Sequence, residues 1–242
     1  MAIRHGPSDP LAAHITTNGL VFYINPHISS CWDGSSSTIN DLSLGGLTCT
    51  GTAITRSPGG YFNFNGSSSL INTGSQLIDT GTYSISSSTD DYTLEAWIYV
   101  RSSQGTTTNA DSIIGSQGSY GVGMQVGING SVPRVNHGAR STSNFYSSNF
   151  SYNQWRHIAW AHDHGVGSTV FHNGASDTTS SGSSYNIAST SANWGNMTIG
   201  NSSSRVTGYY DGWMGAVRVY NRALSGSEVL LNYNADKARY GL

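Results

Sequence analysis

Acidic side chains are scarce in this chain and are widely spaced. Retaining glycosidases commonly use two carboxylates about 5–5.5 Å apart, which a tight motif on one strand face can supply. The chain has two glutamates, Glu95 and Glu228, in unrelated segments, and its adjacent aspartates are Asp90 and Asp91. Neighbouring residues of a strand point to opposite faces, so these aspartates do not form such a pair. The sequence therefore predicts that the chain is not an enzyme, and glycoside hydrolysis ranks last among its functions.

Histidines are concentrated between residues 157 and 172. His162 and His164 are two positions apart, so on a strand they would share one face, which is a metal-ligand spacing. The alternative is that both are solvent-exposed histidines of a turn. The sequence favours the turn and keeps His162 and His164 as candidate metal ligands.

Aromatic and amide side chains lie together in several polar segments. Sugars stack their apolar ring faces on aromatic side chains, while amide and hydroxyl side chains bind the hydroxyl groups of the sugar. The alternative is that the rings pack at the rim of the domain or fill a subunit contact, where Tyr and Trp are also common. The candidate carbohydrate-binding residues are Phe145, Tyr146, Asn193, Trp194, Tyr209, Tyr210 and Asp211.

The composition excludes several classes of partner. Charged residues make up 10% of the chain and the formal net charge is −2, whereas nucleic-acid-binding proteins concentrate Lys and Arg on one face. No apolar run approaches the roughly 20 residues of a membrane-spanning helix. The start, MAIRHGPSDP, has no apolar stretch of the kind found in a secretory signal. We therefore expect no nucleic acid, no membrane and no secretory leader.

Two cysteines, Cys31 and Cys49, are present. They are too few for a disulfide framework or a four-cysteine zinc site. The sequence favours two reduced, partly buried thiols over a bridge between residues 31 and 49.

Short stretches with period-two alternation recur along the chain, separated by clusters of Gly, Asn and Ser. This pattern predicts many strands in an all-β, two-sheet antiparallel sandwich. Asn129-Gly130 and Asn173-Gly174 are predicted turns, because both residue types tolerate a positive φ. The expected strands cover residues 20–24, 61–65, 93–100, 112–116, 123–128, 155–162, 168–174, 196–200 and 215–221.

The last segment reads as a short helix. Ser225 followed three residues later by Glu228 is the spacing of a capping box. The predicted apolar face of this helix consists of Leu224, Val229, Leu230 and Tyr233.

The first residues show no periodicity. We expect residues 1–16 to form an N-terminal arm outside one domain over 17–242, and the arm to anchor the protein to a partner. The arm residues that define this prediction are Arg4, His5, Pro7 and Pro10.

Four blocks, in order, resemble laminin-G-like, concanavalin A-like jelly-roll domains. They are YFNFNGSSSLINTG (61–74), YTLEAWIYV (92–100), the pair QWRHIAW (154–160) and VFHNGA (170–175), and the closing segment that contains VRVYNRALS (217–225). The resemblance implies a jelly-roll sandwich with a short C-terminal helix, and it places HDHGVG (162–167) at a hairpin turn.

The two ends of the chain resemble virion structural proteins of tailed phages, including cyanophage-like ones. The motifs are HGP (5–7), NGLVFYIN (18–25) and YNADKARYGL (233–242). This resemblance implies a virion protein that decorates the capsid or forms part of a fibre or knob, with weak adhesion to polysaccharide. The alternative is a tail receptor-binding lectin for host glycans. The implied partners are other virion proteins, host-surface glycans and further copies of the chain.

Calcium is the ion that the jelly-roll resemblance implies, and it requires several oxygen ligands. No dense acidic loop motif is present, so no cofactor is predicted as a requirement. The candidate calcium ligands are Asp111, Asn129, Asn136 and Asp211.

Overall fold

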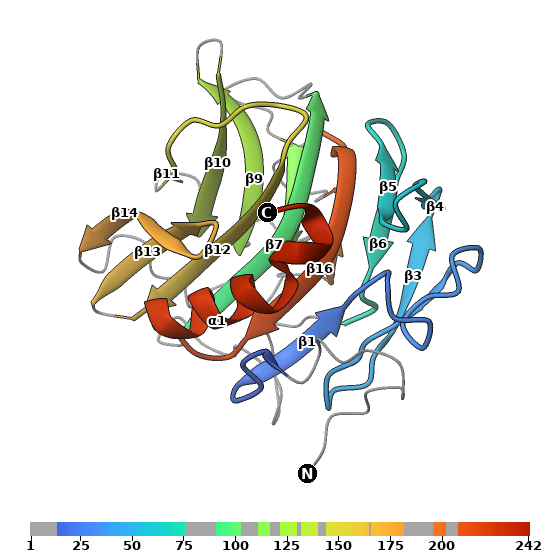
Figure 1. Cartoon of the computed structure of the whole chain (residues 1–242), viewed down its shortest axis with the longest axis horizontal. Helices are drawn as coiled ribbons and strands as arrows, with labels where there is room; N and C mark the ends of the chain where they lie inside the picture. Colours follow the sequence, from blue (N-terminus) through green and yellow to red (C-terminus); the bar gives the residue numbers. More distant parts are fainter. Residues whose placement is uncertain are drawn as a thin grey trace.

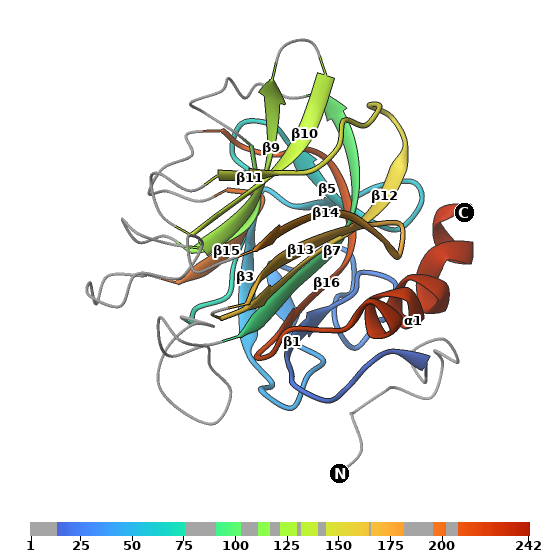
Figure 2. The same ribbon diagram turned by 90° about the vertical axis from the view of Figure 1, so that its left-hand side faces the viewer.

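A computed structural model of the protein describes residues 14–75, 91–102, 111–116, 122–129, 132–139, 144–164, 166–181, 196–201 and 208–242. Two antiparallel eight-stranded sheets pack face to face, and one helix lies on the outside of the first sheet (Figures 1 and 2). The predicted all-β antiparallel sandwich with a short C-terminal helix is confirmed.

The first sheet has the strand order β14-β13-β12-β7-β16-β5-β4. Two shorter strands share one side of β16, because β5 pairs with its first half and β1 pairs with its second half. The strands of this sheet are β1 (Leu20–Ile24), β4 (Thr55–Arg56), β5 (Phe62–Asn65), β7 (Tyr92–Ser102), β12 (Trp155–Asp163), β13 (Gly167–His172), β14 (Ala175–Ser181) and β16 (Asp211–Tyr220).

The second sheet has the order β11-β10-β9-β8-β15-β6-β3-β2. Its strands are β2 (Thr38–Asn40), β3 (Thr48–Thr52), β6 (Leu70–Asn72), β8 (Asp111–Ser116), β9 (Val122–Asn129), β10 (Val132–Ala139), β11 (Asn144–Tyr146) and β15 (Met197–Ile199).

The alternation of β7 explains how the sandwich is built. Leu94, Ala96 and Ile98 point between the two sheets and are fully buried. Glu95 and Trp97 point to the opposite side, yet they are also fully buried. Helix α1 (Gly226–Asp236) lies in front of β7, β12 and β16 and covers that side (Figure 1).

Helix α1 begins as the sequence predicts. Ser225 is the N-cap, and its side chain and that of Glu228 form the reciprocal capping box. The predicted apolar face is wrong in part, because Leu230 is 45% exposed. The buried face instead consists of Val229, Asn232, Ala235 and Asp236, two of which are polar. A 3-10 helix (Lys237–Tyr240) follows directly.

The first described residues pack on α1. Ile15 and Thr16 are buried, and the Thr16 amide donates to Asn232 Oδ1 at 2.7 Å. Residues 1–13 of the predicted anchor arm, among them Arg4, His5, Pro7 and Pro10, lie outside the described residues.

Cys31 and Cys49 are both buried and free. Burial raises the pKa of each thiol to about 12. Among the described residues, no helix has the length and apolar character needed to cross a membrane.

Candidate functional site

Part of the outer face of the first sheet extends beyond α1. In Figure 1 the ends of β7 and β16 that carry residues 99–102 and 211–213 reach past the helix. Trp155, Tyr99 and Trp213 are direct cross-strand partners on β12, β7 and β16, and each remains partly exposed. Their positions on the strands therefore direct three aromatic side chains to one uncovered surface.

Tyr61 completes what we call the aromatic cluster, which consists of Tyr61, Tyr99, Trp155 and Trp213. The Tyr99 and Trp213 rings stack with centroids 4.5 Å apart, and the centroids of Tyr61 and Trp155 are 4.4 Å apart. The Tyr99–Trp155 and Tyr61–Trp213 centroid separations are 5.6 and 6.4 Å. Each ring thus contacts two others, which holds the cluster in one arrangement and leaves part of each ring in solvent.

The buried Tyr240 packs against the aromatic cluster. Its ring lies 4.0 Å from Trp97 and 4.7 Å from Trp155, measured between centroids. Its hydroxyl accepts the Ala216 amide at 3.0 Å. A Cβ at Gly215 would lie 2.0 Å from that hydroxyl, so the close approach of Tyr240 to β16 requires glycine there.

A pocket of about 300 Å³ adjoins the aromatic cluster. Pockets for small ligands begin at about this size and combine apolar rings with a few polar groups. The aromatic residues of its lining are Tyr99, Trp155 and Tyr240. The remaining lining residues are Asn153, Gln154, Arg156, Asn173, Gly241 and Leu242.

Three amide side chains of the pocket have unused hydrogen-bonding capacity. Asn153 and Gln154 are exposed, and their side chains make no hydrogen bond to any described residue. Asn173 Oδ1 accepts the His157 amide at 3.0 Å, which leaves its Nδ2 available. Asn153 and Asn173 have φ values of 59° and 50°. These left-handed conformations are tolerated by Asn, and they fix the two turns beside the pocket.

Among the charged residues near the site, Arg101 and Asp211 are paired, whereas Arg156 lines the pocket without a carboxylate partner among the described residues. Arg101 and Asp211 form an ion pair at 2.7 Å, and Ser102 donates to Asp211 at 2.6 Å. The side chain of Arg156 starts from the face of β12 opposite to that of Trp155. Its guanidinium carbon lies 5.6 Å from the centroid of the Phe150 ring. The surface that a ligand meets is therefore aromatic and amide in character.

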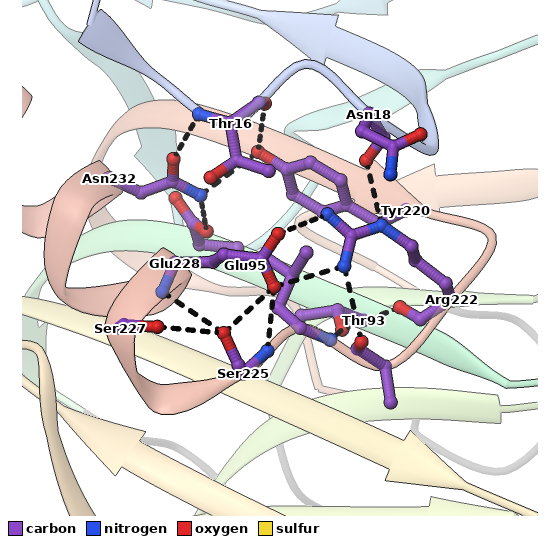
Figure 3. Close-up of polar contacts among 12 residues, drawn as sticks. Thr16, Asn18, Thr93, Glu95, Tyr220, Arg222, Ser225, Ser227, Glu228 and Asn232 are labelled. Atoms are coloured by element: carbon purple, nitrogen blue, oxygen red, sulfur yellow. Dashed lines mark hydrogen bonds and ion pairs between the residues drawn. The ribbon is translucent and has the colours of Figure 1, made fainter.

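Glu95 belongs to a buried polar network beneath α1 (Figure 3). Arg218 bridges Glu95 and Asp236, while His157 Nε2 lies 3.1 Å from Glu95 Oε1 and Asn232 donates to Glu95 at 2.7 Å. Burial alone would raise the pKa of Glu95, but Arg218 and His157 lower it to about 2. This carboxylate holds the helix to the sheet and has no contact with solvent.

The predicted carbohydrate-binding residues are not brought together. Tyr210 is fully buried against Phe64, with centroids 5.7 Å apart, so it offers no ring face to a sugar. Tyr209 is half-buried, and Asp211 borders the aromatic cluster through its ion pair with Arg101. The remaining candidates are Phe145 and Tyr146, whose backbone lies in β11 of the second sheet, and Asn193 and Trp194, which lie outside the described residues.

The prediction that His162 is an exposed turn residue is wrong. His162 lies in β12, where alternation directs it between the sheets, and its Nδ1 is 2.9 Å from Ser168 Oγ. Burial lowers the pKa of His162 to about 4, against an opposing effect of Asp91. His164 follows the end of β12 and is half-buried.

No group of three or more metal-ligating side chains occurs in the described parts of the chain. Asp111 is fully buried at the start of β8. Asn129 and Asn136 are strand residues, in β9 and β10.

The aromatic cluster is missed by sequence reasoning that looks for sugar-binding residues in loops. Part of its signal is present, since Tyr99 and Trp155 lie within predicted strands, whereas Trp213 precedes the predicted strand 215–221 and lies in β16. What the sequence does not show is the strand register that makes them neighbours.

The two packed antiparallel sheets and the C-terminal helix define a jelly-roll sandwich. Residues 65–230 match the family model described as "Concanavalin A-like lectin/glucanases superfamily" (Laminin_G_3). The chain belongs to this superfamily, as the resemblance predicts. No curated protein sequence shows significant similarity to it.

Solved structures share the fold at low sequence identity. Trypanosoma rangeli sialidase in complex with sialic acid matches with a TM-score of 0.66 and 16% identity over 93% of this chain and 34% of that chain. Domain 4 of AbnA, an extracellular arabinanase from Geobacillus stearothermophilus in complex with arabinotriose, matches with a TM-score of 0.62 and 15% identity over 89% and 98% of the two chains. This chain therefore spans about a third of the sialidase and nearly all of the arabinanase domain.

These relatives overturn the prediction that the chain is not an enzyme. The matched structures are parts of a sialidase and an arabinanase, both glycoside hydrolases, and this finding contradicts the prediction. That prediction depended on the lack of a closely spaced pair of glutamates or aspartates in the sequence, which is too narrow a criterion, because some glycoside hydrolases use other residues.

Proposed function

We propose that the protein binds carbohydrate at the aromatic cluster and the adjoining pocket. The observation that carries this proposal is the placement of partly exposed rings beside amides with unused hydrogen-bonding capacity. Rings supply the apolar surface for a sugar face, and the amides supply donors and acceptors for its hydroxyls. The arabinotriose complex of the arabinanase domain supports a small neutral glycan as ligand.

Glycan-array binding followed by calorimetry tests this proposal. Trp155→Ala is expected to weaken the affinity for the best glycan about 10-fold or more, since stacking and buried apolar area are lost together. Leu231→Ala is the matched control, because Leu231 is exposed on α1 away from the pocket. Equal affinity of Trp155→Ala and the native protein, with both folded by circular dichroism, would rule out this site.

Hydrolysis of the bound glycan is a second candidate function, favoured by the fold that the chain shares with glycoside hydrolases. Asp211 is the described carboxylate on the same face of β16 as Trp213. Chromatography of the glycan after incubation tests for cleavage, with Asp211→Asn as the variant. Cleavage that persists at the native rate in Asp211→Asn assigns no role to this carboxylate.

The biological setting proposed is the surface of a tailed-phage virion, on a capsid decoration, fibre or knob. The support is the resemblance of HGP (5–7), NGLVFYIN (18–25) and YNADKARYGL (233–242) to such proteins. In that setting the partners are other virion proteins, further copies of the chain and host-surface glycans. Quantitative mass spectrometry of purified particles tests this, and absence of the protein from the particles contradicts it.

A further inference from the structure

The pocket lies at one end of a longer row of outward-facing side chains. Trp155, Tyr99, Trp213, Asn63 and Thr55 are successive cross-strand partners on β12, β7, β16, β5 and β4. Adjacent strands are about 4.8 Å apart, so the three spacings from Trp155 to Asn63 cover about 14 Å. A single sugar ring in the pocket leaves most of this row unused.

The far end of the row also offers polar groups. Asn63 is half-exposed between two buried phenylalanines, and its Nδ2 donates to Thr55 Oγ1 at 2.8 Å. Asn63 Oδ1 is buried and has no hydrogen-bond partner among the described residues, so a ligand at this end would meet the amide through its Nδ2, which carries a second N–H, beside the exposed Thr55 side chain. Amide groups therefore lie on both sides of the rings, in the pocket and at Asn63.

The two arginines beside the row, Arg101 and Arg56, already have hydrogen-bond partners within the protein. Arg101 is paired with Asp211. The Arg56 guanidinium donates to the carbonyls of Pro26 and Asp33 and lies 5.9 Å from the Trp32 ring. Arg156 has no carboxylate partner among the described residues, but its side chain starts on the opposite face of β12 and its guanidinium lies beside Phe150. On the outer face, an anionic sugar would therefore meet no unpaired cation along the row, whereas a neutral one needs none.

We propose that the ligand is an extended, neutral oligosaccharide that lies across the strands. One ring occupies the pocket, and the following rings pass over Tyr99 and Trp213 toward Asn63. This inference rests on the proposed carbohydrate-binding function and adds the length and charge of the ligand.

Isothermal titration of the full chain with sugars of increasing length tests the inference. The neutral probes are arabinose, arabinotriose and arabinohexaose, and glucose, cellotriose and cellohexaose. A hexasaccharide of galacturonic acid is the anionic probe. The informative variant is Asn63→Ala, and its matched control is Asn234→Ala, which removes an exposed amide from α1.

The affinity of the native protein is expected to rise from monosaccharide to hexasaccharide in at least one neutral series. Asn63→Ala should weaken hexasaccharide binding about 3- to 10-fold, as one lost hydrogen bond predicts, and should leave monosaccharide binding unchanged. Asn234→Ala should bind every probe as the native protein does. The galacturonic acid hexasaccharide should bind more weakly than the best neutral hexasaccharide.

Each contrary result has its own meaning. Equal affinity for all lengths, with no effect of Asn63→Ala, overturns the extended ligand while leaving the pocket as a binding site. Equal or tighter binding of the anionic hexasaccharide overturns the neutral ligand. Failure of the native protein to bind any probe overturns both the inference and the proposed function.

Discussion

Tyr99 and Trp213 are direct partners on β7 and β16, and their rings stack with centroids 4.5 Å apart and planes inclined by 26°. The two residues are 114 positions apart in sequence (213 − 99), so only the pairing of the strands brings them together. This stack forms the centre of the aromatic cluster. It gives the outer face of the first sheet a rigid apolar surface next to exposed amides.

The stack should contribute to stability as a pair. In a double-mutant cycle with Tyr99→Ala and Trp213→Ala, we expect a coupling of about 0.5–1.5 kcal/mol in the free energy of unfolding. Urea denaturation of the native protein, the two single variants and the double variant measures it. Strictly additive effects would show that the two rings do not stabilise each other.

The buried ion pairs should be much more costly to break than the exposed one. Arg218→Met leaves the buried carboxylates of Glu95 and Asp236 without their cation, so we expect a loss of about 3–5 kcal/mol. Arg222→Met breaks a pair with Glu228 whose side chains are 26% and 31% exposed, and should cost about 0–1 kcal/mol. Chemical denaturation at pH 7 compares the two, and equal losses would contradict the predicted role of burial.

The protein should lose stability as the pH falls through two separate ranges. The pKa of His162 is about 4 in the folded chain against 6.5 in a model compound, so the unfolded chain binds the proton more tightly. Stability should therefore fall between pH 6.5 and about 4. The pKa of Glu95 is about 2 against 4.5, so its contribution is complete above pH 4.5 and is lost toward pH 2.

The variant that isolates the first range is His162→Asn. It should flatten the pH dependence of the unfolding free energy between pH 6.5 and 4, whatever its effect on stability at pH 7. Burial also lowers the pKa of His172, which remains in the variant and accounts for any residual slope. An unchanged slope would show that His162 is not the group that titrates.

The two thiols should be unreactive in the folded protein. Burial raises the pKa of Cys31 and Cys49 to about 12, so at pH 8 almost no thiolate is present. We expect the native protein to react only slowly with Ellman's reagent and both thiols to react rapidly in guanidinium chloride. Rapid reaction of the native protein would show that at least one cysteine is accessible.

Most apolar strands could be predicted from the sequence, and the polar ones could not. β1, β7 and β12 have strong alternation or β-branched and aromatic residues, and each was predicted to within two residues at either end. β3 reads TCTGT and β14 reads ASDTTSS. Such segments form strands because their neighbours supply hydrogen-bond partners, a cause that does not appear in the local pattern.

The candidate site, like the strands, could be predicted from the sequence only in part. Polar segments with aromatic residues predict a sugar site, but Tyr210 is fully buried, and the residues of the aromatic cluster lie mainly on strands. Helix α1 was expected to bury Leu230, whereas it buries Asn232 and Asp236. Those polar residues are acceptable inside because Glu95, Arg218 and Tyr220 bind them, and no helical periodicity reveals partners from distant strands.

The sequence by itself determined the sandwich class, the superfamily, most apolar strands and the capping box at Ser225 and Glu228, because alternation and local hydrogen bonds operate over a few residues. Tertiary structure alone decided which aromatic residues meet and which remain exposed. Cross-strand register places Trp155, Tyr99, Trp213 and Asn63 in one row. Helix α1 covers Trp97 and leaves Tyr99 partly exposed to solvent. The strand register and the placement of the helix both depend on contacts between residues far apart in the chain.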